Sequence, residues 1–249
     1  ASIVDILFKC NWVKRVLFLA DRNALVKQAK GAFLEHLPEL SSINLTKEKE
    51  NNTTRLVFST YQSIINKIDS VRNEEERFYG VGHFDLIIVE TPGIGQGDAG
   101  IVPYVDASMY VMTPEFGAQS QLEKIDMLDF ADIVVINKFD RKGAADALRD
   151  VSKQVQRNQE AWHKSPSELA VFGSIASRFG DDGVTSAYHG LLAVLRDDKL
   201  GDKRLREWES TLPFRNERMP SERSVIVPTA RQRYLAEISE AIRHYHQQT

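Results

Sequence analysis

The sequence predicts a three-layer α/β fold built around a mostly parallel β-sheet. Short apolar runs rich in β-branched residues alternate with stretches of helical periodicity, the order of elements that builds a parallel sheet. The most informative run is Leu-Ile-Ile-Val at 86–89, which ends in the carboxylate of Glu90. Because this run is apolar at every position, we expect a strand that is buried on both faces.

The 249 residues, 42% of them hydrophobic, are enough for one large or two small domains. A net charge of −3 indicates no general attraction to nucleic acid or to membranes. No run approaches the ~20 apolar residues of a membrane helix, so we expect no membrane partner. The one cysteine, Cys10, excludes an internal disulfide framework and indicates the reducing cytoplasm. We expect its side chain to be buried among apolar neighbours.

The remaining elements follow from the same patterns, taken in chain order. Apolar runs predict strands at 15–20, 55–59, 86–89, 107–112, 132–136 and 170–172. Helical periodicity predicts helices at 24–37, 61–68, 120–130, 142–156 and 183–195. Polar composition predicts exposed connections at 40–54 and 74–77 and a charged linker after 196. Tyr234, Ile238 and Ile242 then mark an amphipathic helix near the end of the chain.

The loop after 86–89 has the composition of a phosphate-sensing segment. Glu90 is the candidate metal ligand and catalytic carboxylate, because an acid at the tip of a buried strand can hold Mg²⁺ directly or through water. The backbone amide of Gly93 is placed to face a terminal phosphate, and Gln96 is a supporting catalytic candidate in the same loop. The alternative for Glu90 is an ordinary acid at the end of a strand.

A second strand, at 132–136, runs into Asn137-Lys138-Phe139-Asp140, the Asn-Lys-x-Asp pattern of guanine readers. Asp140 would accept hydrogen bonds from the N1-H and N2 amino donors of guanine, Asn137 would bind the base edge, and the stem of Lys138 would stack on the ring. Adenine would leave Asp140 facing an acceptor, a mismatch that costs about 1–3 kcal/mol or more. The alternative is a chance tetrapeptide in a turn.

A companion base contact is expected at Ala176, in the segment Gly-Ser-Ile-Ala at 173–176. The usual pattern there is Thr-Ser-Ala, and this chain has Ile175 where the serine is expected. Because Ile175 differs from the usual serine, the sequence does not establish this second base contact.

The first third of the chain resembles the motor subunit of type I restriction enzymes, a DNA-translocating ATPase of helicase type. The residues that carry the resemblance are 16–29, 58–64 and 78–89. That family would continue with Asp-Glu-Ala-His, where this chain has Glu-Thr-Pro-Gly at 90–93. The resemblance implies an alternative function, a fragment of an ATP-driven DNA translocase, and DNA is a partner only under that alternative.

From 89 onward the chain resembles another family, the GTPase portion of fused isobutyryl-CoA mutase, which is related to the small GTPases that chaperone methylmalonyl-CoA mutase. The matching segments are 89–98, 102–106, 110–118, 121–132, 137–144, 226–228 and 234–238. This resemblance implies a P-loop NTPase type of fold that binds GTP or GDP with Mg²⁺. The implied partners are the catalytic and cobalamin-binding domains of an acyl-CoA mutase. Cobalamin itself is not expected to bind this chain, which has no Asp-x-His-x-x-Gly motif.

Because the two resemblances meet within 86–90, we interpret the chain as a hybrid of a helicase-motor-like half (1–88), a GTPase-like half (89–195) and a C-terminal linker with a helix (196–249). The pattern G-x-x-x-x-G-K-[ST] of a phosphate loop occurs nowhere in it. The charge-assisted hydrogen bonds of such a loop contribute about 1.5–3 kcal/mol each, against a total of about 8 kcal/mol for micromolar binding. We therefore expect impaired hydrolysis, with a non-catalytic hybrid scaffold as a third possibility.

Overall fold

The computed structural model describes residues 2–49, 53–68, 71–73, 76–80, 82–91, 98–117, 122, 125–178, 180–196, 210, 212–214 and 217–221. The chain divides into two compact units, one comprising Ala1–Val105 and Asp198–Thr211, the other Asp106–Asp197 and Leu212–Thr249. Each unit has its own parallel sheet and its own apolar core. The boundaries predicted at 88 and 195 stay predictions.

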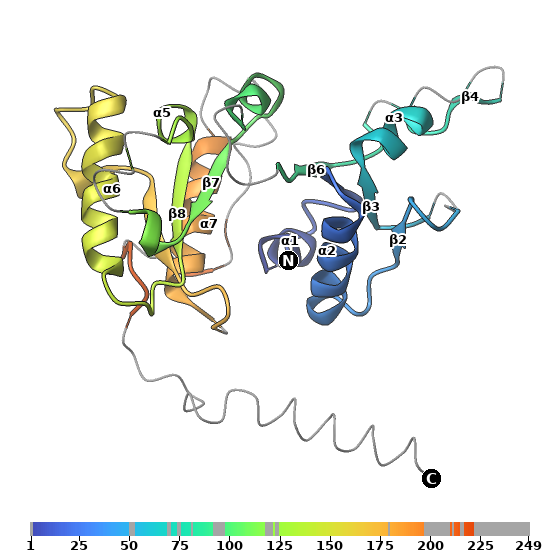
Figure 1. The fold of residues 1–249 in the computed structure, drawn as a ribbon. Coiled ribbons are helices and arrows are strands. Elements are labelled where there is room, and N and C mark those ends of the chain that lie inside the picture. Colours follow the sequence, from blue (N-terminus) through green and yellow to red (C-terminus); the bar gives the residue numbers. More distant parts are fainter. Residues whose placement is uncertain are drawn as a thin grey trace, which may run out of the picture. The chain divides into compact units, whose positions relative to one another are not determined.

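The first unit is built on a four-stranded parallel sheet with the strand order β2-β3-β1-β6 (Figure 1). Its helices are α1 (Ser2–Lys9), α2 (Asn23–His36), α3 (Tyr61–Ile68) and the 3-10 helix η1 (Asp98–Tyr104). Its strands are β1 (Val16–Ala20), β2 (Ser42–Asn44), β3 (Leu56–Thr60), β4 (Val71–Asn73), β5 (Glu76–Arg77) and β6 (Leu86–Val89). Strands β4 and β5 form a separate antiparallel pair.

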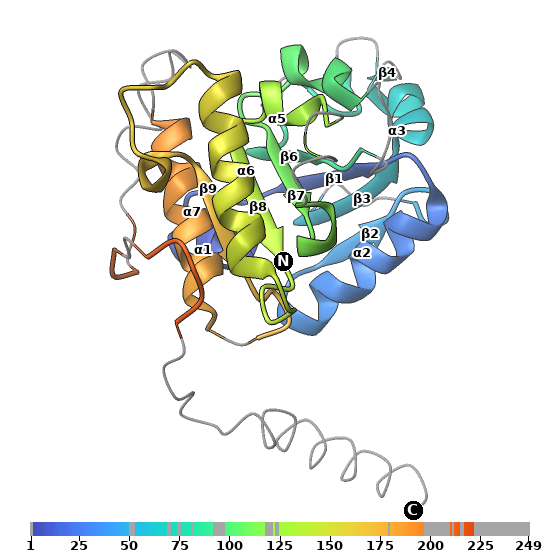
Figure 2. The same ribbon diagram turned by 60° about the vertical axis from the view of Figure 1, so that its left-hand side comes forward.

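Successive residues of a strand point to opposite faces of the sheet. In this unit each face is covered by its own apolar cluster. Val16, Phe18 and Ala20 of β1 belong to one apolar cluster with residues of α1 and α2, and Figure 2 shows α2 beside the strands of this sheet. On that face Phe58 makes ring contacts with Phe18 and Phe33, at centroid distances of 5.7 and 5.3 Å. The opposite face packs against α3 and the aromatic segment that precedes β6. The first unit therefore has three layers.

Strand β6 differs from its prediction. It forms where expected, but the interpretation that it is buried on both faces is wrong, because Ile87 is 54% exposed. The physical reason is its place at the end of the strand order, where it pairs only with β1 among the described strands. Cys10 is also only partly buried, since it lies in the turn after α1 rather than inside the core.

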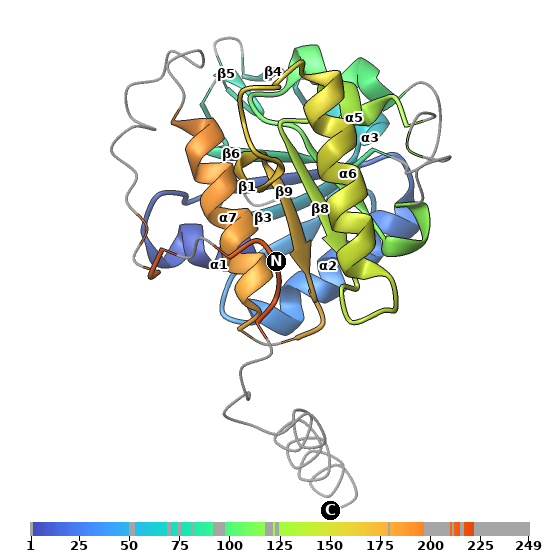
Figure 3. The same cartoon turned by 90° about the vertical axis from the view of Figure 1, so that its left-hand side faces the viewer.

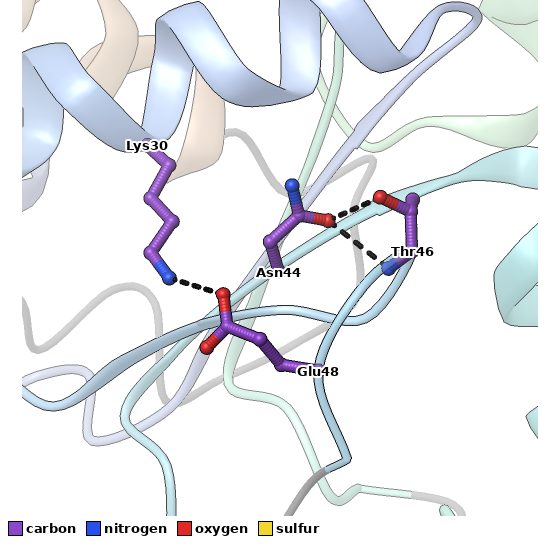
Figure 4. A network of polar contacts seen from close by, with 4 residues as sticks. All are labelled: Lys30, Asn44, Thr46 and Glu48. Carbon is purple, nitrogen blue, oxygen red and sulfur yellow. Dashed lines mark hydrogen bonds and ion pairs between the residues drawn. The ribbon is translucent and has the colours of Figure 1, made fainter.

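The segment predicted as an irregular connection at 40–54 contains the short strand β2, which pairs in parallel with β3. Figure 4 shows the polar contacts around the loop that follows it: Asn44 Oδ1 accepts hydrogen bonds from the Thr46 amide (3.0 Å) and hydroxyl (2.7 Å). Lys30 Nζ of α2 lies 2.8 Å from Glu48 Oε1 and lowers the pKa of that carboxyl. Because Glu48 is about half exposed, this ion pair contributes little to stability.

The second unit has a three-stranded parallel sheet in the order β7-β8-β9. Its strands are β7 (Met109–Met112), β8 (Ile133–Asn137) and β9 (Val171–Ser174). Its helices are α5 (Met127–Phe130), α6 (Ala144–Asn158), α7 (Asp182–Leu195) and the 3-10 helices η2 (Pro114–Phe116) and η3 (Pro166–Glu168). Figure 3 shows α6 and α7 flanking the strands, and the two apolar clusters confirm that they cover opposite faces.

The α/β fold with parallel sheets is thus confirmed, with the described parallel strands distributed over two sheets. The helix predicted at 120–130 is confirmed at Leu122 and in α5, which begins at Met127; residues 118–121, 123 and 124 lie outside the described residues. The amphipathic helix expected at 234–242 also lies outside them. Within the described chain, no helix combines the length and apolar character needed to cross a membrane.

The aromatic contacts of the first unit give a test of its core. Phe58→Ala removes a side chain that is 1% exposed and should lower the free energy of unfolding by about 3–5 kcal/mol, measured by urea denaturation. The control Leu34→Ala changes a residue of α2 that is 38% exposed and should cost about 0.5 kcal/mol or less. Equal losses in the two variants would contradict this account of the core.

Candidate functional site

The predicted site residues fall into two described groups. Glu90 follows β6 in the first unit, whereas Asn137, Lys138, Asp140 and Ala176 belong to the second. Gly93 and Gln96 lie outside the described residues. Their expected roles stay predictions.

Glu90 lies at the carboxyl end of the four-stranded sheet. Its amide donates a 2.8 Å hydrogen bond to the carbonyl of Leu19, which continues the β1–β6 ladder by one step. The hydroxyl of Tyr61 donates to the Glu90 carbonyl. Although the residue as a whole is exposed, partial burial of the carboxyl raises the pKa of Glu90, and the charge of Asp21 raises it further.

Asp21 was missed as a site residue by the sequence reasoning. The signal was available, because Asp21 follows the apolar strand β1 just as Glu90 follows β6, and parallel neighbours end at the same edge. Asp21 Oδ2 accepts from Arg22 Nε at 3.0 Å, while Oδ1 is buried and has no hydrogen-bond partner among the described residues. Two carboxylates at one edge of a sheet, of which Glu90 has a raised pKa, suit a divalent cation.

The two carboxylates are not a complete metal centre. Among the described residues no group of three or more His, Cys, Asp or Glu side chains is arranged to hold a metal ion. Mg²⁺ commonly binds through one or two carboxylates and takes its other ligands from water and phosphate. The residues present therefore fit Mg²⁺ only together with such ligands.

The guanine-reader turn lies at the end of β8, next to the companion loop at the end of β9. Asn137 and Ser174 are partners in the parallel register. Asn137 Oδ1 accepts hydrogen bonds from the Ala176 amide (3.0 Å) and the Ser174 hydroxyl (3.4 Å). The Phe139 amide donates to the Ser174 carbonyl at 3.0 Å. The structure therefore brings two of the predicted residues, Asn137 and Ala176, into direct contact.

The side chains of Lys138 and Asp140 are exposed, as a surface that receives a base requires. Lys138 has a φ of 58°, a left-handed conformation that turns the chain sharply after β8. The guanidinium of Arg141 pairs with the carboxylate of Glu115, which ties the turn to η2. Hydrogen bonds from Thr113 and from the Glu115 backbone, together with Arg141, lower the pKa of Glu115 to about 2.

Comparison with known proteins identifies the family. Residues 74–208 match the family described as Methylmalonyl Co-A mutase-associated GTPase MeaB, a stretch that contains the turn, the companion loop and Glu90. The chain belongs to the MeaB GTPase family. Its guanine-reader turn is therefore found in a family of GTPases, as the resemblance predicted.

Several similar curated proteins are fused isobutyryl-CoA mutases. That of Cupriavidus metallidurans is 61% identical over 163 residues, which cover 66% of this chain and 14% of the mutase. That of Nocardia farcinica is 57% identical over 166 residues, 67% of this chain and 15% of the mutase. That of Geobacillus kaustophilus is 48% identical over 163 residues, which cover 66% of this chain and 14% of the mutase. The chain thus spans about a seventh of the length of these relatives.

Residues 1–90 match a different family, described as Type III restriction enzyme, res subunit. The predicted restriction-enzyme segment is confirmed, although the matching family carries the type III rather than the type I description. The two matches overlap at 74–90, the stretch that ends with β6 and Glu90. A MeaB-family GTPase segment is therefore joined to a restriction-enzyme segment through a strand that fits both.

The support of the turn by β9 can be tested with glycines. A Cβ at Gly173 would lie 2.4 Å from the ring of Phe139, so Gly173→Ala should destabilise the protein by about 1–3 kcal/mol in urea denaturation. Gly31→Ala in α2 meets open space and should instead stabilise it by about 0.5–1 kcal/mol. A neutral Gly173→Ala would show that this close approach does not constrain the turn.

Proposed function

We propose that this chain binds guanine nucleotides through the turn 137–140 and the loop 174–176. The observation that carries the proposal is the direct hydrogen bond between Asn137 Oδ1 and the Ala176 amide, which aligns the two base-contacting segments. Asp140 is exposed beside them, and its carboxylate would accept the two guanine donors. Membership of a GTPase family supports the same ligand.

The proposed context is a cobalamin-dependent acyl-CoA mutase, in which this chain is the GTP-binding portion. Three fused isobutyryl-CoA mutases share 48–61% identity with it over about two thirds of its length, which supports this assignment. The partners would be the catalytic and cobalamin-binding domains of such a mutase, with cobalamin held by those domains and not by this chain. A cytoplasmic location follows from the single cysteine.

Hydrolysis is proposed to be impaired. Glu90 would hold Mg²⁺, with Asp21 beside it, while Gly93 and Gln96 would face the terminal phosphate. The printed sequence contains no G-x-x-x-x-G-K-[ST] segment to supply backbone donors and a lysine to the phosphates. One carboxylate pair cannot neutralise the charge of a triphosphate, because it is itself negative.

A second candidate function is a fragment of an ATP-dependent DNA-translocating subunit of a restriction enzyme, favoured by the match of residues 1–90. A hybrid scaffold without catalysis is the third. An ATP motor has no use for a guanine reader, so base choice separates the first candidate from the second.

We expect guanine to be preferred over adenine. In titrations of the purified chain with mant-GDP and mant-ADP in the presence of Mg²⁺, GDP should bind about 10-fold more tightly or better, and Asp140→Ala should abolish the difference, because the carboxylate supplies the charged hydrogen bonds.

The matched control is Asp146→Ala, which removes another exposed carboxylate of the same unit from α6 and should leave the preference unchanged. Equal, weak binding of both nucleotides that Asp140→Ala does not alter would rule out guanine reading. Tighter binding of mant-ADP would favour the motor fragment.

We expect GTP hydrolysis at the background rate, followed as phosphate release with Mg²⁺. Glu90→Gln should not change that rate, because without a phosphate-binding loop the metal is not fixed against the β- and γ-phosphates. A Mg²⁺-dependent rate that disappears in Glu90→Gln would show that the chain is a working GTPase and that other residues bind the phosphates.

A further inference from the structure

We propose that Asp181 is a positioning residue for guanine recognition, which fixes the loop 174–176 so that the Ala176 amide meets Asn137. This inference deepens the proposed function and rests on it for its effect on nucleotide binding. The positioning itself is a property of the protein without nucleotide, so it can be tested separately.

One oxygen of Asp181 serves two backbone amides. Asp181 Oδ2 accepts a 3.0 Å hydrogen bond from the amide of Ile175, in the loop, and another of 3.0 Å from the amide of Val184, in the first turn of α7. The residue is 3% exposed, and its second oxygen is buried without a hydrogen-bond partner among the described residues. The carboxylate therefore links the companion loop to the start of a buried helix.

The link reaches the base-reading surface within one residue. Ile175 is held by Asp181, and the next amide, that of Ala176, donates to Asn137 Oδ1. The loop is thus fixed from both sides, by the turn after β8 and by the carboxylate at the start of α7. Ile175 stands where a serine is usual and brings no hydroxyl of its own, so its backbone makes the contacts: its amide donates to Asp181 Oδ2, and its carbonyl accepts a 2.8 Å hydrogen bond from the Arg178 amide.

The close approach that permits this contact depends on Gly183. A Cβ there would lie 2.0 Å from the Gly173 carbonyl and 3.0 Å from Asp181 Oδ2. Glycine lets the first turn of α7 sit directly against β9, and this brings the Asp181 side chain beneath the loop. The Asp181 carboxylate therefore has two roles: it caps α7 through the Val184 amide and anchors the loop through the Ile175 amide.

Two substitutions separate these roles. Asp181→Asn keeps an acceptor oxygen of the same reach and should retain both contacts. Asp181→Ser keeps a good helix cap for Val184, but its hydroxyl lies closer to the main chain and should not reach Ile175. If the serine variant fails to fold, Asp181→Thr replaces it, because threonine also offers a capping hydroxyl.

The first measurement is amide hydrogen exchange by NMR on the full chain without nucleotide. In Asp181→Ser the Ile175 and Ala176 amides should exchange about 3- to 10-fold faster, as expected for the loss of one hydrogen bond, while Val184 and the helix content stay unchanged. Asp181→Asn should exchange like the parent chain. Unchanged exchange in Asp181→Ser, or equally fast exchange in both variants, would overturn the proposal.

The second measurement is the mant-GDP titration. Asp181→Ser should bind mant-GDP about 3- to 10-fold more weakly, with mant-ADP unchanged, and Asp181→Asn should restore the affinity. Full affinity in a folded Asp181→Ser variant would overturn the role in recognition. If the parent chain itself shows no guanine preference, the proposed function fails, and the exchange result alone decides whether Asp181 positions the loop.

Discussion

The parallel pairing of β8 with β9 is the constraint on which the proposed guanine-binding surface depends. In a parallel pair both strands end at the same edge, so segments that are 37 residues apart in sequence meet there as Asn137 and Ser174. The turn then needs no buried core of its own. It takes its conformation from Asn137 Oδ1, from the Phe139 amide and from the loop that Asp181 anchors.

The same constraint acts in the first unit, where β1 and β6 end together and bring Asp21 and Glu90 to one edge. The electrostatics differ between the two units. At the end of β8 and β9 an amide oxygen and backbone groups satisfy one another, whereas at the end of β1 and β6 partial burial, and then the charge of Asp21, raise the pKa of Glu90. At the β8–β9 edge the polar groups already pair with one another, which suits the recognition of a ligand by its shape. At the β1–β6 edge the negative charge is not balanced, which suits the binding of a cation.

Much of this architecture could be predicted from the sequence, because continuous apolar runs identify parallel strands and 3.6-residue periodicity identifies helices. The helix at Tyr61–Ile68 was predicted to the residue, and the turn at 137–140 was found from its motif. Strand β2 was missed because its three residues, Ser-Ile-Asn, carry too little apolar pattern and form through pairing with β3. The exposure of Ile87 could not be predicted, because it depends on which strand lies beside β6. The contact of Asp181 with the Ile175 amide could not be predicted either, because a side chain that binds a distant backbone amide leaves no pattern in the sequence.

The exposed position of Ile87 bears on the tendency of the protein to associate with itself. Strand β6 is the last of its sheet among the described strands, and an apolar strand at the edge of a sheet is a template for pairing with another chain. Natural proteins blunt such edges with charge, proline or a covering segment, and 86–89 has neither charge nor proline. Pairing along this edge would be a route to aggregation that does not require the protein to unfold.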